Sequence, residues 1–328
     1  MRISIAMATY NGARYLQEQL ASFLAQTRLP DELVVCDDHS EDGSLSILQD
    51  FQKVAEFEVR IVSNRQRLGF VQNFSKALEL CTGDIVFLSD QDDVWLPEKI
   101  DTVMNRFSDD PDVQLLIHDV EYCTEDLTRL GQTKIERLGK FCDVENCYVN
   151  GMATAVRYGF LRLCLPIPTS GPLAHDRWLH SCASAMHRRK ILHQVLALHR
   201  RHQANATVSR GPNVDFATTR VYIAREKVHA FFLGSLRRTS ILGDEGMVVD
   251  NWLQSNRDAL VKSGYATAEH LDILASKIVE KSRYEDARAE ILSSPRLQRF
   301  RGVLSLWRRG GYRSFNGWRS AIKDLLIN

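Results

Sequence analysis

Four short apolar runs, each followed by a helix-like segment, constrain how the N-terminal part of this chain can fold. The runs are typical of buried strands and lie at residues 3–7, 33–36, 59–62 and 84–87. Apolar residues spaced three or four apart follow the first run, as at Leu16, Leu20 and Phe23. Strands and helices that alternate in series predict an α/β fold, with a mostly parallel sheet covered by helices on both faces.

Polar side chains end three of these four runs. Thr9-Tyr10-Asn11 follow the first run, Asp37-Asp38 the second and Asp90-Gln91-Asp92, a DXD pattern, the fourth. The carboxyl ends of strands in an open α/β sheet border the ligand crevice, so these polar groups can converge on one edge. Helix capping explains Asn11 or Asp42 equally well, although capping alone does not require such convergence.

The acidic stretch Ser89-Asp90-Gln91-Asp92-Asp93-Val94-Trp95 is the strongest of these signals. Asp90 and Asp92 share one face if the chain stays extended. Their mutual repulsion favours a divalent ion that carries a diphosphate, because Mg²⁺ is typically held by one or two carboxylates plus substrate phosphates. The sequence contains no G-x-x-x-x-G-K-[ST] and no G-x-G-x-x-G, so metal would have to hold the diphosphate. An acidic turn that caps the helix after Pro97 is the alternative.

The charge of the chain is split unevenly along its length. Residues 1–120 carry 10 Lys/Arg and 21 Asp/Glu, whereas residues 121–328 carry 32 and 20. An acidic part suits a metal ion and a nucleotide, and a basic part suits an anionic partner. A length of 328 residues with 44% hydrophobic residues fits one large α/β unit plus an appendage.

The cysteines and the hydropathy indicate a cytoplasmic protein. Most of the seven cysteines lie in apolar contexts and none forms a C-x-x-C pair, which is typical of reduced core thiols: Cys36, Cys81, Cys123, Cys142, Cys147, Cys164 and Cys182. We expect no signal peptide, and no apolar stretch approaches the ~20 residues that a spanning helix needs. Peripheral contact with the inner face of the cytoplasmic membrane remains an additional option.

Three segments together resemble the family 2 glycosyltransferases. These are Ser4–Gly12, Leu33–Ser44 and the acidic stretch Ser89–Trp95, and the resemblance extends over residues 1–215. It implies the GT-A fold, a nucleotide-sugar donor, and transfer of a hexose with inversion at the anomeric carbon. The S-D-Q-D-D-V-W sequence is closest to a bacterial branch that includes many rhamnosyltransferases of surface polysaccharides.

The resemblance also implies roles for particular residues on the donor side. Asp38, with Asp37, would reach the base of a pyrimidine nucleotide, Asp90 would lie near the ribose, and Asp92 would bind Mg²⁺ or Mn²⁺ on the diphosphate. The other residues expected to bind the nucleotide sugar are Thr9, Tyr10, Asn11, Gly69, Asn73 and Gly151. Gly69 permits close approach and Asn73 can donate a hydrogen bond, although a loop and a first helical turn explain both without a ligand.

Asp176 is the expected catalytic base. Inverting transfer is one in-line displacement, so a base must take the proton of the acceptor hydroxyl on the face opposite the leaving nucleotide. Asp176 follows a loop rich in proline and glycine at 166–171, and a helix cap is the alternative for this carboxylate. We expect His175 to orient the site rather than to act as the base.

The basic segment Leu198–Asn205 resembles a family segment that follows the helix of the base. His202 would complete the metal shell or touch the diphosphate, and Arg200 or Arg201 would bind phosphate. An exposed basic strand end explains these residues equally well.

The C-terminal part, residues 216–328, is expected to be a helical region. Its tail, residues 296–328, carries eight Lys/Arg against one acid, Asp324, interleaved with aromatic and aliphatic residues. This pattern is typical of an interfacial membrane segment. A helix pair that closes over the catalytic domain, or a dimer contact, is the alternative, and no nucleic-acid recognition motif is present.

The sequence therefore predicts a metal-dependent inverting glycosyltransferase. It would move a sugar, with rhamnose as the leading candidate, from a UDP- or dTDP-sugar to a hydroxyl of a cell-surface polysaccharide or lipid-linked glycan. The alternative is a non-catalytic module that binds nucleotide sugar or glycan on the same scaffold. A nucleotidyltransferase is a weaker option, because the Gly-rich phosphate loop is missing.

Overall fold

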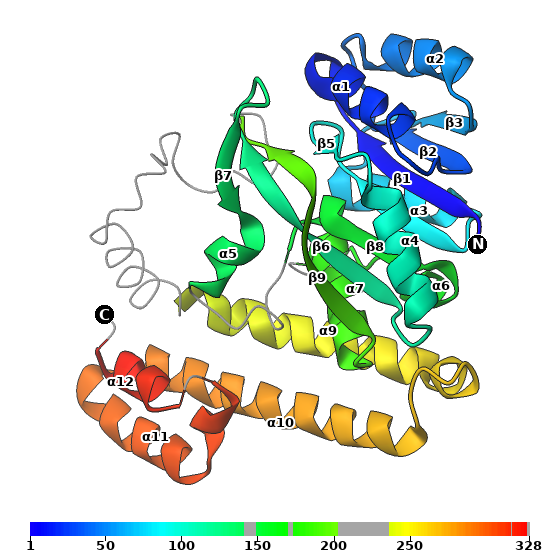
Figure 1. Ribbon diagram of the computed structural model, residues 1–328. Helices are drawn as coiled ribbons and strands as arrows, with labels where there is room; N and C mark the ends of the chain where they lie inside the picture. The colour runs from blue at the N-terminus through cyan, green and yellow to red at the C-terminus, as the bar shows by residue number, and fades with distance from the viewer. Residues whose placement is uncertain (141–148, 170–172, 203–235, 316, 327–328) are drawn as a thin grey trace. The chain divides into compact units, whose positions relative to one another are not determined.

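The computed structural model describes residues 1–140, 149–169, 173–202, 236–315 and 317–326, which belong to two compact units (Figure 1). The predicted boundary after residue 215 lies outside the described residues, as do Cys142 and Cys147. The N-terminal unit is an α/β unit and the C-terminal unit consists of helices. The predicted α/β class with a helical C-terminal region is thus confirmed.

The sheet of the α/β unit has nine strands in the order β3-β2-β1-β4-β8-β6-β9-β5, with β7 paired to β6. The strands are β1 (Ile3–Thr9), β2 (Glu32–Asp37), β3 (Glu58–Ser63), β4 (Ile85–Ser89), β5 (Val94–Trp95), β6 (Leu115–Cys123), β7 (Arg129–Thr133), β8 (Thr154–Arg157) and β9 (Arg189–Arg200). Strands β3, β2, β1 and β4 are parallel, whereas β8 runs antiparallel between β4 and β6. The sheet is therefore mixed.

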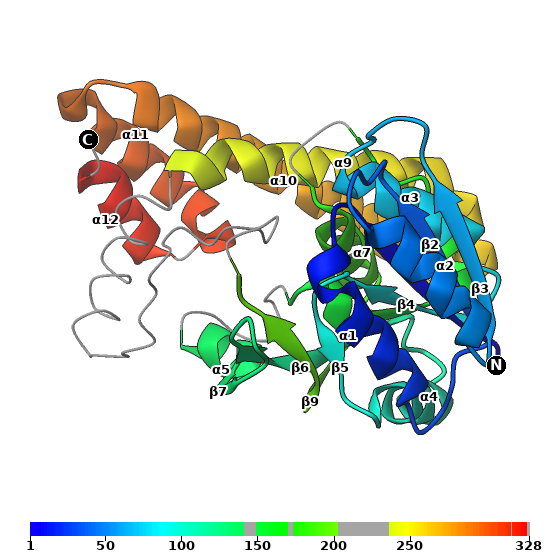
Figure 2. The same ribbon diagram turned by 90° about the horizontal axis from the view of Figure 1, so that it is seen from above.

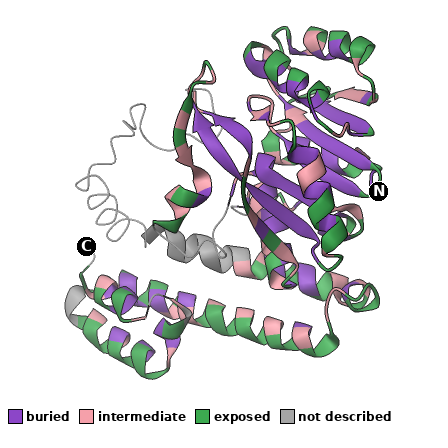
Figure 3. Ribbon diagram, in the orientation of Figure 1, coloured by how far each residue is buried: buried purple, intermediate pink, exposed green. Residues whose placement is uncertain are grey.

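The helices cover both faces of this sheet. They are α1 (Ala13–Leu24), α2 (Ser44–Val54), α3 (Phe70–Leu80), α4 (Lys99–Asp109), α5 (Lys134–Gly139), α6 (Tyr158–Cys164) and α7 (His175–Ala185). Figure 2 shows α1 and α4 on one side of the strands and α3 and α7 on the other. The central strands β1, β2 and β4 are buried almost throughout, which explains their continuous apolar runs (Figure 3).

The connection between β4 and β5 requires the sheet to curl. In the strand order β4 and β5 are separated by β8, β6 and β9, which in a flat sheet would place them about 19 Å apart at ~4.8 Å per strand. Only residues 90–93 join them, and five extended steps span at most ~18 Å. These residues bend rather than stay extended, so the shared face predicted for Asp90 and Asp92 does not follow from strand geometry.

Most predicted strands and helices of the α/β unit are present, with differences in the middle of the chain. The polar segment 121–139 contains β7, which forms a hairpin with β6, and α5. The segment 150–156 begins with the 3₁₀ turn η2 (Gly151–Ala153) before β8, although its small and apolar residues are typical of a single strand. Strand β9 was not predicted, because adjacent exposed polar residues, His193 and Gln194, interrupt the period of two in its outer half.

The C-terminal unit is built on two long helices that lie side by side, α9 (Leu236–Lys262) and α10 (Ala268–Ser293). The tail forms α11 (Arg296–Arg308), the turn η3 (Gly311–Ser314) and α12 (Trp318–Leu326). The apolar core shared by α10 and the tail consists of Ile291, Val303, Leu306, Tyr312 and Ala321. One face of the tail therefore packs on α10. Within the described ranges, no helix is long and apolar enough to cross a membrane.

Candidate active site

The ends of β1, β2 and β4 lie side by side, as predicted. Thr9 pairs with Asp37 across β1 and β2, and Met7 pairs with Ser89 across β1 and β4. The Thr9 hydroxyl donates to Asp37 Oδ1 at 3.0 Å, and Ser40 donates to Asp37 from both its amide and its hydroxyl. Asp37 is fully buried, and each of its two oxygens accepts a hydrogen bond from the protein.

Asp38 organises the loop that precedes α3. Its Oδ1 accepts from Asn64 Nδ2 at 3.0 Å and from the Leu68 amide at 2.7 Å, whereas its Oδ2 accepts from the Gly69 amide at 2.8 Å. Gly69 has φ 85°, a left-handed conformation that favours glycine. Each carboxylate oxygen has about two acceptor sites, so Oδ2 keeps one for a further donor.

The side chain of Asn73 forms hydrogen bonds within the protein. It is buried, donates to the Cys36 carbonyl at 2.7 Å and accepts from Asn64 Nδ2 at 2.8 Å. Asn64 was not singled out from the sequence, because an asparagine after a strand is typical of any turn. The two amides link α3 to the ends of β2 and β3.

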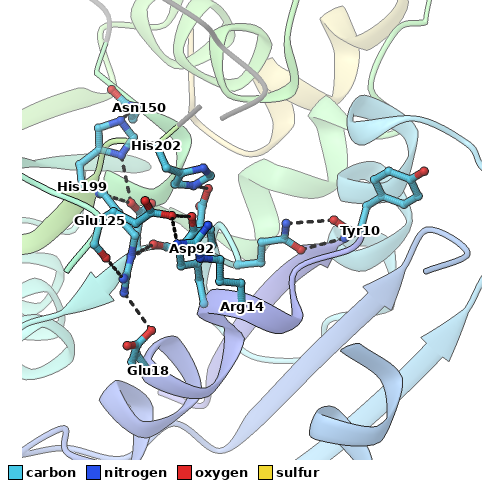
Figure 4. A network of polar contacts seen from close by, with 12 residues as sticks. Tyr10, Arg14, Glu18, Asp92, Glu125, Asn150, His199 and His202 are labelled. Atoms are coloured by element: carbon cyan, nitrogen blue, oxygen red, sulfur yellow. Dashed lines mark hydrogen bonds and ion pairs between the residues drawn. The ribbon is translucent and has the colours of Figure 1, made fainter. Parts of the chain in front are cut away.

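The side chains of Tyr10 and Asn11 border the same edge. The backbone of Tyr10 binds the Gln91 side chain through its amide at 2.8 Å and its carbonyl at 3.0 Å (Figure 4). Arg67 lies over the Tyr10 ring at 4.0 Å. Asn11, with φ 46°, accepts from the Glu41 amide at 2.9 Å. Gln91 thereby ties the acidic loop, residues 90–93, to the end of β1.

The acidic loop is held on its other side by the end of β9 (Figure 4). Asp92 Oδ2 lies 2.8 Å from His202 Nε2, and Asp93 Oδ1 lies 3.0 Å from His199 Nδ1. The ring of His202 lies against Tyr15 with centroids 4.4 Å apart. The structure therefore brings together Asp92 and His202, the two predicted metal ligands, from segments far apart in the sequence.

Arg200 fastens the acidic loop to α1. The side chain is buried, and its Nε donates to the Asp92 carbonyl at 2.8 Å while Nη2 pairs with Glu18 at 3.2 Å. These contacts assign Arg200 to holding the loop, which differs from the phosphate contact predicted for Arg200 or Arg201. Its burial could not be inferred from a basic run at a strand end.

Burial and the neighbouring carboxylates raise the pKa of Asp90. Burial raises the pKa of Asp90 well above its usual value, and the charges of Asp93, Asp92 and Asp176 raise it further. Lys99, fully buried at the start of α4, opposes this effect. Its Nζ donates to the Met152 carbonyl at 2.7 Å and lies 3.5 Å from the centre of the Trp95 ring.

Asp176 lies in the first turn of α7, nearly buried, against the Gly151 turn. Burial raises its pKa to about 6, although it accepts a hydrogen bond from the Arg177 amide. A Cβ on Gly151 would lie 3.0 Å from His175 Nε2 and 3.1 Å from Asp176 Cβ, so a side chain here would require these neighbours to shift by a few tenths of an ångström. His175 stacks on Phe74 at 3.9 Å, and burial lowers its pKa to about 3.

The donor set at the loop suits a hard divalent ion in part. Asp92 supplies carboxylate oxygens and His202 an imidazole nitrogen, and the clustered negative charge would be relieved by a cation. No group of three or more potential ligands is arranged for a metal within the described ranges. Water or the phosphates of a substrate would have to complete the shell, as is usual for Mg²⁺.

The comparisons with known proteins agree with this geometry. The family model described as "Glycosyl transferase family 2" matches residues 4–160. An uncharacterized glycosyltransferase of Nostoc sp. (strain PCC 7120) is 27% identical over 219 residues, 64% of this chain and 67% of that protein. The dTDP-rhamnosyl transferase RfbG of Shigella flexneri is 35% identical over 98 residues, 29% of this chain and 34% of that protein.

Among solved structures, S. aureus TarS 1-349 in complex with UDP-GlcNAc superimposes with a TM-score of 0.53 and 16% identity. The superposition covers 98% of this chain and 90% of that one. The fold is therefore the GT-A fold of glycosyltransferases. Residues 4–160, which contain the three sequence segments, thus match the family 2 glycosyltransferases, as those segments predict. The match to RfbG spans only about a third of the length of that protein, so the substrates of this chain are a separate question.

Proposed function

We propose that this chain is a metal-dependent inverting glycosyltransferase with a UDP- or dTDP-sugar as donor. The observation that carries the proposal is the gathering of carboxylates from two elements: the charge of Asp176, from α7, raises the pKa of Asp90 in the acidic loop. A base and a diphosphate site must face the same sugar in an inverting transfer. Rhamnose is the leading candidate sugar, because RfbG is named a dTDP-rhamnosyl transferase.

Asp176 acts as the base in this proposal. Its carboxylate takes the proton of the acceptor hydroxyl while that oxygen forms a bond to the anomeric carbon. The bond from the anomeric carbon to the diphosphate oxygen breaks in the same step, and the electron pair leaves with the nucleotide. The pKa of about 6 suits a base that must be ionised near neutral pH yet accept a proton readily.

The nucleotide base would lie at the ends of β1 and β2. The N3–H of uracil or thymine can donate to the remaining acceptor site of Asp38 Oδ2, and the absence of a side chain at Gly69 lets the base approach. Asp37 and Asn73 fix this edge, because their polar side-chain atoms already bind the protein, and Asn11 contributes through its Oδ1. Thr9 and Tyr10 complete the wall.

Asp92 and His202 would hold Mg²⁺ or Mn²⁺. The ion supplies charge neutralisation for the departing diphosphate when it is bound. Asp90 would face the ribose, and its raised pKa favours a protonated carboxyl that can donate a hydrogen bond to a sugar oxygen.

A screen of nucleotide sugars tests the proposal. Purified protein with Mn²⁺ should bind UDP- or dTDP-sugars and release UDP or dTDP slowly in water, and chelation should weaken donor binding measured by calorimetry. Asp92→Asn should weaken donor binding in Mn²⁺, whereas Asp112→Asn, on an exposed carboxylate far along the chain, should not. Donor binding with no turnover on any glycan acceptor would favour the non-catalytic module. GDP that competes as well as UDP and dTDP would refute the pyrimidine preference.

The acceptor is proposed to be a hydroxyl of a cell-surface polysaccharide or of a lipid-linked glycan. The name of RfbG gives a donor sugar and no acceptor, so the acceptor class rests on the family resemblance of the sequence motifs. Peripheral membrane contact through residues 296–328 belongs to the same proposal, with the enzyme on the cytoplasmic side, and nucleic acid is not an expected partner.

A further inference from the structure

The tail helix α11 has two different apolar faces. Val303 and Leu306 are buried in the core shared with α10. Phe300, Leu304 and Trp307 are exposed, and their spacing of four and three residues places them on one stripe of the helix. Phe300 is 60% exposed, which is unusual for a phenylalanine with no role outside the fold.

Helix α12 repeats this arrangement. Ala321 and Asp324 face the interior, whereas Trp318, Ile322 and Leu326 are exposed at intervals of four residues. Trp318 is 59% exposed, and Arg319 lies 5.5 Å from its ring centre. Two helices that follow one another in the chain therefore each present a large apolar stripe to solvent.

The exposed charges of the tail itself are all positive. Arg301, Arg308 and Arg309, together with Leu304 and Ser305, line a cavity of about 390 Å³ on α11. The single acid of the tail, Asp324, is buried and binds Arg288 through two hydrogen bonds. Burial of this acid leaves the outer surface of the tail without negative charge within the described residues.

We infer that the outer face of α11 and α12 is a docking surface for a membrane of anionic phospholipids. The inference rests on the membrane contact in the proposed function and deepens it by assigning the surface and the class of lipid, but it does not depend on the transfer reaction. Arginines beside an apolar stripe match a bilayer interface, where phosphate groups lie beside acyl chains. Nucleic acid offers phosphates but would leave the apolar stripes in water, and a second copy of this surface would repel the first through its arginines.

The test uses the full chain and vesicles of phosphatidylglycerol mixed with phosphatidylcholine. We expect binding to these vesicles, little binding to pure phosphatidylcholine, and release at high salt, because the attraction decays over a Debye length of about 8 Å at physiological ionic strength. The variant Arg301→Gln/Arg308→Gln should lower the partition coefficient by at least about tenfold. Arg106→Gln/Lys277→Gln removes the same number of exposed cations elsewhere and should change it far less.

A second pair of variants tests the apolar stripes. Phe300→Ser/Trp318→Ser should lower partitioning at least about tenfold and reduce the fluorescence blue shift on vesicle binding. Met247→Ser/Ile273→Ser, which changes exposed residues on α9 and α10, is the matched control, and thermal melting verifies that each variant is folded. Binding that is equal in all four variants would overturn the inference. Loss of vesicle binding in the arginine variant alone would also overturn it. A change in the monomer–dimer equilibrium of the apolar variant in the absence of lipid would overturn it as well, because it would assign the stripes to a contact between copies of the chain.

Discussion

Asp176 combines two properties that conflict in a folded protein. Its side chain is nearly buried, yet the proposed chemistry requires it to be ionised. Burial of an ionised carboxylate weakens the native state, because folding favours the protonated form. The conflict is typical of a functional group rather than of a helix cap.

We predict that Asp176→Asn loses activity without losing donor binding. The amide is nearly isosteric with the carboxyl but cannot accept the proton of the acceptor, so kcat should fall by ~10²–10⁴. Donor affinity, measured by calorimetry, should change little. Asp101→Asn, in the first turn of α4, is the control. A fully active Asp176→Asn enzyme would remove the assigned base.

We predict that the pH dependence of both the rate and the stability reflects the ionisation of Asp176. Because burial raises the pKa of Asp176 to about 6, the rate should fall as the pH is lowered through about 6. The free energy of unfolding should change with pH in the opposite direction to the rate. Because the pKa of Asp176 is higher in the folded protein than in the unfolded chain, where it is near 4, this group contributes its full stability below about pH 4. That contribution is lost as the pH rises through about 6. Above that pH, Asp176→Asn should therefore melt at or above the temperature of the wild type. A lower melting temperature there would contradict burial as the cause.

Single residues also mark where sequence reasoning stops. The acids Asp92 and Asp176 stand out by motif and order, so the sequence alone identifies them as candidates. Lys99 does not stand out, since a lysine after Pro97 is typical of a solvated first turn. It is fully buried, beside the Trp95 ring and the acidic loop. Its partner, the Met152 carbonyl, is 53 residues away, a pairing that no local pattern predicts.

At the level of elements, η2 and α7 approach each other closely at Gly151. We predict that Gly151→Ala lowers kcat, by ~10-fold or more, because its Cβ would displace His175 and Asp176 by a few tenths of an ångström. The fold should persist, with a loss of ~1–3 kcal/mol in the free energy of unfolding. Gly246→Ala, where a Cβ meets only Ile278 at 3.6 Å, is the control in steady-state kinetics and melting. An unchanged kcat would show that the Asp176 position tolerates the shift.

The tail elements depend on one buried ion pair. Asp324 accepts from Arg288 Nε at 2.6 Å and Nη2 at 2.8 Å, and from the Tyr312 hydroxyl at 2.9 Å. Removal of one member of a buried pair typically costs ~3–5 kcal/mol, so Asp324→Ala should detach α12 and lower the denaturation midpoint. Asp272→Ala breaks the exposed pair with Arg257 and should cost no more than ~1 kcal/mol. Equal effects would show that the pair is not structural.

The sequence predicted elements well where one period dominates. Strands β1, β2 and β3 each contain the predicted apolar run and are two residues longer than it. In the tail, the stripe with Val303 and Leu306 packs on α10 and the stripe with Phe300 stays exposed, whereas membrane contact stays a prediction. Composition alone could not separate the two faces, because both are apolar.

At the scale of the whole molecule, the two units have separate cores. Ligand binding should therefore protect one of them selectively. We predict that UDP- or dTDP-sugar with Mn²⁺ slows hydrogen exchange at the ends of β1, β2 and β4 but not in α9 and α10. At ~100 times the dissociation constant the donor should stabilise its unit by ~2.7 kcal/mol. Protection confined to α9 and α10 would place the nucleotide elsewhere.

The curled sheet has a further consequence for how much the chain can vary. Surface loops usually accept insertions, because loop entropy grows slowly with length. Residues 90–93 differ, since this bridge joins two strands that lie on opposite sides of three others in the strand order. Its length sets how tightly the sheet closes. Gln91 of the bridge binds Tyr10 after β1, and Arg200 of β9 binds the carbonyl of Asp92. One extra residue there would lengthen the connection between β4 and β5. The sheet would then close less tightly, while every individual strand stayed intact.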